Sequence, residues 1–168
     1  IFKLHNKDQF DIYIYSLTSK EDELTDELKK NINVFRNISN ISDENAAFIA
    51  RKDSLDIAVD LMGYTKNMRL SIFSLRVAPI QIAYLGYPGT TGSDCMDYLI
   101  ADKVIIPDKY RKFYSEKVIN MPNCYQCNDS SRKISEKKFS RTELGLPKDD
   151  FVFACFNANN KITSVEFE

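Results

Sequence analysis

The feature that most constrains the fold of this chain is the alternation of short apolar runs with segments that begin like helices. The runs are rich in β-branched and aromatic residues, which favour strands. They lie at Phe10–Leu17, Asn33–Ile38, Leu55–Leu61, Ile80–Leu85, Tyr98–Ala101 and Lys117–Met121. Strands that alternate with helices form parallel sheets, because each crossover brings the chain back to the same end of the sheet. The sequence therefore predicts an α/β fold with a doubly wound parallel sheet.

Helix-start residues and apolar periodicity place the expected helices between these strands. Ser19 is expected to cap a helix whose apolar stripe continues to Ile32, and Ser42 to cap a second helix that ends near Arg51. Shorter helices are expected near Leu70–Leu75 and Asp108–Phe113. The run Leu55–Leu61 is nearly continuous in apolar residues, which predicts a strand covered on both faces.

The composition changes after residue 122, which divides the chain into three expected parts. Residues 1–122 are predicted to form most of one Rossmann-like lobe, and the polar, charged segment 123–148 is predicted to be a surface linker. A new α/β unit is expected over 149–168, with a buried strand at 151–156 and a helix that begins at the capping box 163–166. Because the chain starts at Ile1 and stops as this helix begins, we expect it to be a piece of a longer protein.

Charge and hydropathy exclude several classes of function. The chain carries 23 basic and 24 acidic residues, a net charge of -1, so it has no basic footprint for nucleic acid or an anionic membrane surface. No apolar run approaches the roughly 20 residues that span a bilayer. A soluble protein without a nucleic-acid or membrane partner is therefore expected, and any bound anion must be held by local groups.

Cysteine and histidine positions do not predict a metal site. Cys124 and Cys127 form a CxxC pair, which fits two reduced thiols in a surface loop, a redox pair or half of a metal site. The single histidine, His5, is far from this pair in sequence and precedes the first strand, away from the edge where such sheets bind ligands. We therefore expect no metal and no catalytic role for His5.

Three segments follow strands, where a doubly wound sheet binds its ligands. Residues 86–93 carry three glycines, which suit either a close backbone approach to a ligand or a structural turn. Residues 156–163, with Lys161, suit a phosphate or a merely solvated lysine. Residues 60–69 suit a polar site or an ordinary surface loop.

Beyond these physical patterns, an ordered series of motifs resembles the catalytic region of the O-linked N-acetylglucosamine transferase family. The motifs are GYT, APIQ, LGYPGTTG, DYLIAD, YSEK, MPN and FNANNKI, and together they cover essentially the whole chain, most weakly in its first 50 residues. The resemblance implies a GT-B enzyme, in which two Rossmann-like lobes bind a nucleotide sugar between them. The chain would hold most of the N-terminal lobe and the first strand of the second.

The resemblance also implies roles for individual residues. The sugar nucleotide would be bound by Leu85, Gly86, Tyr87, Pro88 and Lys161, of which Lys161 would also be the catalytic group, and Tyr64, Thr65 and Lys66 would lie on the acceptor side. The reaction would be the inverting transfer of N-acetylglucosamine from UDP-GlcNAc to Ser or Thr hydroxyls of proteins, without a metal or cofactor. Such enzymes are nucleocytoplasmic and carry tetratricopeptide repeats.

Departures from the family pattern leave other functions open. Ala158 stands where relatives carry Gln or Asn, and Asn160 where many carry Tyr, which favours a non-catalytic GT-B-like scaffold. The histidines that the family uses, and most of its uridine-binding lobe, have no counterpart in this chain, so we expect the chain alone to be inactive. A SPINDLY-type protein O-fucosyltransferase that uses GDP-fucose is a second alternative. A Rossmann-type oxidoreductase is disfavoured because no GxGxxG follows a strand.

Overall fold

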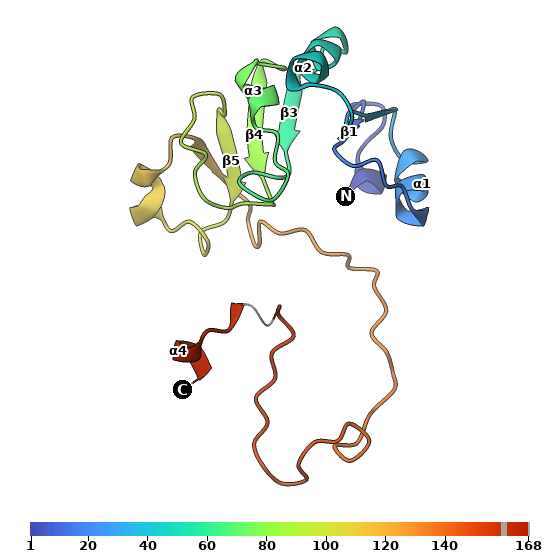
Figure 1. Cartoon of the computed structure of the whole chain (residues 1–168), viewed down its shortest axis with the longest axis vertical. Helices are drawn as coiled ribbons and strands as arrows, with labels where there is room; N and C mark the ends of the chain where they lie inside the picture. The colour runs from blue at the N-terminus through green and yellow to red at the C-terminus, as the bar shows by residue number, and fades with distance from the viewer. Residues whose placement is uncertain (159–160, 168) are drawn as a thin grey trace. The chain divides into compact units, whose positions relative to one another are not determined.

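The strands of the chain form two parallel sheets. The smaller sheet pairs β1 (Tyr13–Ser16) with β2 (Val34–Asn37). The larger sheet has four strands in sequence order, with β4 between β3 and β5 (Figure 1), and consists of β3 (Ile57–Asp60), β4 (Ile80–Tyr84), β5 (Tyr98–Ala101) and β6 (Lys117–Asn120). Every strand pair is parallel, which confirms the predicted α/β class. The strands divide between two hydrogen-bonded sheets rather than one.

This computed structural model describes residues 1–158 and 161–167. The chain divides into two units, Ile1–Asn128 and Asp129–Glu168, and both sheets belong to the first. The expected boundaries at residues 122 and 149 remain predictions.

The first helices show where capping chemistry decides a boundary. After a short 3-10 helix η1 (Phe2–Leu4), helix α1 covers Glu23–Lys29. Its cap is Asp22, whose carboxylate accepts the Thr25 amide at 2.9 Å in a capping box. The prediction of Ser19 as the cap was wrong, because the Asp22–Thr25 pair satisfies the free amides three residues further along the chain.

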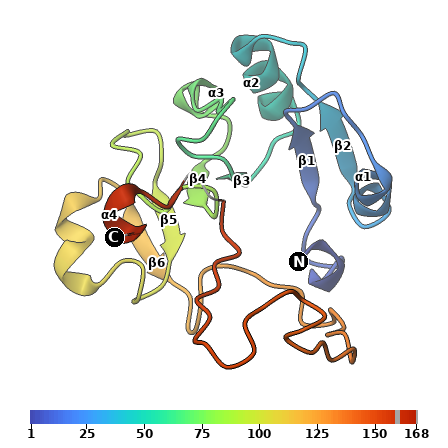
Figure 2. The same cartoon turned by 60° about the horizontal axis from the view of Figure 1, so that its bottom comes forward.

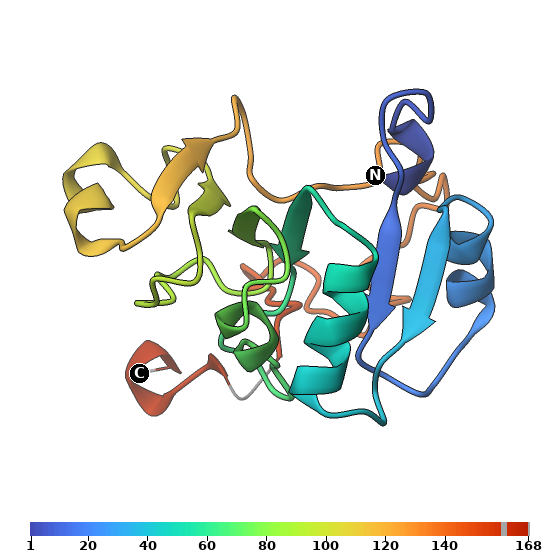
Figure 3. The ribbon, with the colours of Figure 1, turned by 90° about the horizontal axis from the view of Figure 1, so that it is seen from above.

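Helix α2 (Asp43–Lys52) begins at Ser42 as predicted, and the Ser42 hydroxyl accepts the Asn45 amide at 3.3 Å. Figure 3 shows this helix beside β1. Its buried face is made of small side chains, which lets it pack closely against residues of both sheets and of α3 (Ser71–Ser74). The shared cluster consists of Ile38, Ala46, Ala47, Ala50, Ala58, Ile72, Val77 and Ala78. This helix therefore packs against both sheets within one cluster. A second cluster, at the larger sheet, consists of Ala83, Leu99, Ala101 and Ile106.

The larger sheet buries one face more completely than the other. Ala58, Gln81, Ala83 and Leu99 point to the covered face and are buried. On the opposite face Ile57 is 50% exposed and Val59 is 44% exposed, so the prediction that this strand is covered on both faces was wrong for the part of the chain that the structure describes. Successive side chains of a strand point to opposite faces of the sheet, so buried and exposed residues alternate along β3.

Two connections between strands of the larger sheet lie next to the candidate functional site. Figure 2 shows β4, β5 and β6 next to one another. The β5–β6 connection contains a 3-10 helix, η2 (Asp108–Phe113), at the position where a helix was expected. The β4–β5 connection, residues 85–97, has no helix. Its path is fixed by side-chain hydrogen bonds, one of which joins the buried Gln81 amide to the Cys95 carbonyl at 2.6 Å.

The second unit has little regular structure. Residues 123–148 contain no helix or strand, and a turn ends at Gly145, where φ is +66°. Residues 151–156 are expected as a strand, but they form none, because no described strand of this unit offers the backbone partners that a strand requires. Helix α4 (Ser164–Phe167) follows, close to the expected capping box. None of the helices in the described ranges is long and apolar enough to cross a bilayer.

Candidate functional site

The loop after β3 is shaped by the buried carboxylate at the end of that strand. Asp60 accepts the amide of Met62 at 2.9 Å and the amide of Gly63 at 3.0 Å. These bonds turn the chain sharply, and Gly63 adopts a left-handed φ of +55° that side-chain-bearing residues rarely adopt. Asp60 therefore fixes the start of the predicted acceptor-side segment.

The loop after β4 begins with a strained turn. Leu85 has a φ of +72°, and the Gly86 amide donates to the Tyr84 carbonyl at 2.9 Å. A three-residue turn of this kind with a non-glycine residue at positive φ costs about 1–3 kcal/mol and persists only where its surroundings hold it. Such strain is concentrated at ligand sites, which supports a functional reading of this loop.

Two glycines allow the loops to interlock, and a third makes room for a tyrosine ring within the loop after β4. A Cβ added at Gly63 would lie 2.5 Å from Tyr87 Cβ, and one added at Gly86 would lie 2.4 Å from the Leu61 carbonyl oxygen. A Cβ added at Gly89 would lie 2.6 Å from the Tyr87 ring. These glycines therefore serve contacts within the protein, whereas a Cβ at Gly92 would meet nothing within 4 Å. The sequence was compatible with either a ligand cradle or a structural turn. In the structure Gly63 and Gly86 pack the two loops against each other, and Gly89 packs under the Tyr87 ring of its own loop.

Two tyrosines complete the interlocked loops. The Tyr64 hydroxyl donates to the Thr91 carbonyl at 2.5 Å, and its ring meets the Tyr87 ring edge to face at 5.6 Å between centroids. Tyr64 remains 46% exposed and Tyr87 37% exposed. Aromatic faces that are fixed in place and open to solvent can stack on a ligand without reordering when it binds.

The structure brings most of the predicted site residues together. Leu85–Pro88 lies against the loop that carries Tyr64, while Thr65 and Lys66 are exposed directly beside it. Lys161 belongs to the second unit, where it is exposed and shortly precedes α4. Ala158 is also exposed, and Asn160 lies outside the described residues.

Sequence reasoning missed the residues that hold the β4–β5 connection from the side of β6. The Tyr114 hydroxyl donates to the Pro88 carbonyl at 3.2 Å, and the Glu116 carboxylate accepts the Thr91 amide at 2.6 Å. Both belong to the stretch YSEK, which was noted only as a family motif. The available signal was a glutamate directly before a predicted strand, since a carboxylate that is buried at such a position requires hydrogen-bond donors.

Comparison with known proteins identifies this arrangement. The model of the family Glycosyl transferase family 41 matches residues 1–138, which include both interlocked loops. The chain belongs to glycosyl transferase family 41. The family of O-GlcNAc transferases named from the sequence motifs is thereby confirmed, as is the Rossmann-like fold class.

Named relatives of family 41 agree with this assignment. The chain is 37% identical over 163 residues to the probable UDP-N-acetylglucosamine–peptide N-acetylglucosaminyltransferase SEC of Arabidopsis thaliana, covering 94% of this chain and 17% of that protein. It is 32% identical over 163 residues to the corresponding SPINDLY protein of Eustoma exaltatum, covering 95% of this chain and 17% of the relative. The chain thus spans about a sixth of the length of these relatives.

A solved structure extends the agreement to three dimensions. A mutant form of the O-GlcNAc transferase of Thermobaculum terrenum superposes with a TM-score of 0.71 at 31% sequence identity. The match covers 74% of this chain and 24% of that protein chain.

The CxxC pair of this family 41 chain lies in the loop after β6. Cys124 and Cys127 are free and exposed. Between them, the Tyr125 amide donates to Asp102 at 2.8 Å and its carbonyl accepts the Tyr84 hydroxyl at 2.7 Å. These bonds fasten the loop to the carboxyl end of the sheet. Among the residues that the structure describes, no three His, Cys, Asp or Glu side chains are grouped to hold a metal.

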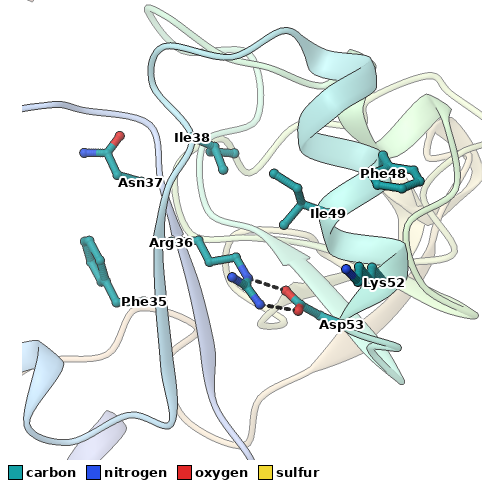
Figure 4. A pocket seen from close by; sticks show the side chains of 8 residues that line it. All are labelled: Phe35, Arg36, Asn37, Ile38, Phe48, Ile49, Lys52 and Asp53. Atoms are coloured by element: carbon teal, nitrogen blue, oxygen red, sulfur yellow. Dashed lines mark hydrogen bonds and ion pairs between the residues drawn. The ribbon is translucent and has the colours of Figure 1, made fainter.

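A separate cavity of about 520 Å³ lies between β2 and α2 (Figure 4). Its lining includes Phe48, Ile49, Lys52 and the ion pair of Arg36 with Asp53. Arg36 holds the pKa of Asp53 below its usual range, and the Tyr15 hydroxyl also donates to Asp53. Both carboxylate oxygens are therefore occupied within the protein, which identifies this pair as a structural brace between strand and helix.

Proposed function

We propose that the complete protein carrying this chain transfers N-acetylglucosamine from UDP-GlcNAc to Ser or Thr hydroxyls of proteins. The observation that carries the proposal is the interlocked pair of loops, GYT and LGYPGT, within the region matched by the family 41 model. Both named relatives are described as UDP-GlcNAc peptide transferases. The proposal includes action in the cytoplasm or nucleus.

The backbone and ring surfaces of Leu85, Gly86, Tyr87 and Pro88 are proposed to line the sugar-nucleotide site. Gly86 and Tyr87 are exposed, while the packing beneath them is too tight for a Cβ at Gly86. A surface fixed in this way contacts the donor without losing further conformational freedom. The neighbouring Tyr64, Thr65 and Lys66 are proposed to face the acceptor.

Lys161 is proposed to act on the departing diphosphate. In the transfer, the bond from the anomeric carbon to the diphosphate oxygen breaks, a bond to the acceptor hydroxyl oxygen forms, and the proton of that hydroxyl is released to water. Negative charge grows on the diphosphate, so an ammonium group stabilises the transition state more than the bound substrate. Inversion follows from a single displacement at the anomeric carbon, and no metal is required by this proposal.

A donor screen on the complete protein tests the function. The purified protein is incubated with a Ser/Thr-containing acceptor protein and either UDP-GlcNAc or GDP-fucose, and glycosylated product is measured by mass spectrometry. We expect product from UDP-GlcNAc. Faster transfer from GDP-fucose would assign the SPINDLY-type reaction instead. Absence of both products, together with no UDP binding by calorimetry, would favour the non-catalytic scaffold suggested by Ala158.

A further inference from the structure

Glu116 is a buried carboxylate to which the proposed function assigns no role. It directly precedes β6 and is 4% exposed. The ion pairs among the described residues do not include it. A buried carboxylate without a cation is costly unless hydrogen-bond donors surround it.

The donors that satisfy Glu116 come from the β4–β5 connection. Its Oε1 atom accepts the Thr91 amide at 2.6 Å and also the Thr91 hydroxyl, and its Oε2 atom accepts the Thr90 hydroxyl at 2.7 Å. The Thr90 oxygen in turn accepts the amide of Ser115 at 3.2 Å and that of Gly92 at 3.0 Å. Both oxygens of one side chain thus bind successive residues of the connection.

The arrangement of donors favours the ionised form of Glu116. Burial opposes ionisation, but the hydrogen bonds from Thr91 and Thr90 outweigh it and lower the pKa of Glu116. A charged acceptor makes hydrogen bonds about twice as strong as a neutral one. The connection is therefore held by a charge at neutral pH.

From Thr91 the contacts continue to Tyr87, which is part of the segment proposed to bind the sugar nucleotide. The Thr91 carbonyl accepts the Tyr64 hydroxyl, and the Tyr64 ring packs on Tyr87. Because the connection has no helix, side-chain contacts of this kind fix its path. Glu116 thus reaches the exposed Tyr87 through two intermediate residues.

We propose that Glu116 is a positioning residue that holds Leu85–Pro88 in the conformation that binds the nucleotide sugar. The inference rests on the proposed function, because it assigns Glu116 an effect on donor binding. The strand pairing of β6 depends on backbone hydrogen bonds that a change of side chain leaves in place. Loss of Glu116 is therefore expected to loosen the connection more than the sheet.

The test compares Glu116→Gln with wild type in the complete protein. Glutamine keeps the size of the side chain but replaces one carboxylate oxygen, an acceptor, with an NH2 group, a donor. That NH2 group would face a threonine hydroxyl whose oxygen already accepts other hydrogen bonds. We expect KM for UDP-GlcNAc to rise about tenfold, equivalent to ~1.4 kcal/mol, with kcat changed less than about threefold because Glu116 does not touch the reacting atoms. Hydrogen exchange of residues 87–92 should accelerate, and that of β5 should not.

Matched variants separate positioning from general stability. Glu136→Gln makes the same chemical change at an exposed glutamate of the second unit and should leave both kinetic constants unchanged. Thr90→Val removes one donor to Glu116 and should raise KM less than Glu116→Gln. Glu116→Asp keeps the charge and should recover part of the donor affinity, and it also serves if the glutamine variant folds poorly.

The outcomes distinguish this inference from the proposed function. A wild-type protein that neither binds nor turns over UDP-GlcNAc overturns both. An active wild type with an unchanged donor KM in Glu116→Gln overturns the role of Glu116 alone. So does a lowered Tm without faster exchange at residues 87–92, because it would show a purely structural carboxylate.

Discussion

The segments LGYPGTTG (Leu85–Gly92) and FNANNKIT (Phe156–Thr163) differ in how the rest of the chain holds them. The first follows a paired strand, accepts hydrogen bonds from the hydroxyls of Tyr64 and Tyr114, and donates hydrogen bonds to the carboxylate of Glu116. The second follows residues 151–156, which pair with no described strand. The difference shows that hydrogen bonds with distant elements, and not the motif's own sequence alone, hold LGYPGTTG in place.

The phenylalanines of residues 151–156 show the same difference between the two units in their exposure to solvent. Phe151, Phe153 and Phe156 are 81%, 90% and 102% exposed, although their sequence reads as a buried strand. Burying such side chains stabilises a fold by about 1.5–3 kcal/mol each relative to leaving them exposed. In the first unit that gain is realised by packing between sheet and helix, and in the second unit the described residues provide no such surface.

The strongest way to break this comparison is to test whether the segment without a paired strand before it carries the reaction. Lys161→Ala removes the ammonium proposed to stabilise the leaving diphosphate, and should lower kcat of the complete protein by about 10²–10³ without changing Tm. UDP release measures the rate. Lys148→Ala, at another exposed lysine of the second unit, is the control. A kcat for Lys161→Ala within threefold of wild type would contradict its assigned role.

The second largest effect is expected from a substitution in the interlocked loops, which should lower the thermal stability of the first unit. Gly86→Ala would place Cβ 2.4 Å from the Leu61 carbonyl oxygen and 2.6 Å from that of Met62. Because backbone must move, we expect a loss of about 1–3 kcal/mol, which lowers Tm of the first unit by roughly 5–10 °C. Thermal unfolding followed by circular dichroism measures it.

The matched change for that experiment is Gly145→Ala in the second unit. Its φ of +66° strains alanine, but an added Cβ meets nothing within 4 Å. Tm of the first unit should therefore stay unchanged. Equal shifts for Gly86→Ala and Gly145→Ala would show that the tight packing of the loops contributes nothing.

The smallest expected effect is a difference in acid sensitivity. Hydrogen bonds from the amides of Ile105, Tyr125 and Val104 hold the pKa of Asp102 below its ordinary value of 3.8. Ionised Asp102 therefore stabilises the first unit above that value, and the contribution is lost as the pH falls through the lowered pKa.

Asp102→Asn tests this pH dependence because asparagine does not titrate. The variant should lose less Tm than wild type as the pH is lowered from about 5 to 3. Asp149→Asn, in the exposed second unit, should behave like wild type. Parallel Tm curves for wild type and Asp102→Asn would show that Asp102 contributes nothing to acid sensitivity.

Local patterns predicted much of the first unit. All six of its strands and the Ser42 cap could be read from the sequence, because apolar periodicity and cap chemistry act over a few residues. The prediction of Ser19 as a helix cap was wrong because Ser19 and Asp22 lie close together in the sequence and both residue types can cap a helix. The strand at 151–156 failed for another reason: a strand depends on a partner that its own sequence does not specify.

The candidate site was predictable in position but not in construction. The loops after β3 and β4 were expected at the ligand edge of the sheet, and their motifs named the family. The contacts of Gly63 and Gly86 join residues more than 20 positions apart, and the glutamate at 116 is held by threonines 25 and 26 positions earlier. Such partners are set by the tertiary fold, which spacing within one motif does not reveal.

The helix-free connection between β4 and β5 has a consequence for how this protein can change in length. Three side chains from outside the connection bind it at successive points: Tyr114 at Pro88, Glu116 at Thr90 and Thr91, and Tyr64 at Thr91. One inserted or deleted residue would shift these attachment points out of register together, as it would in a packed helix. This connection should therefore resist insertions, and a tag or a spliced segment is better placed in the exposed stretch 129–148.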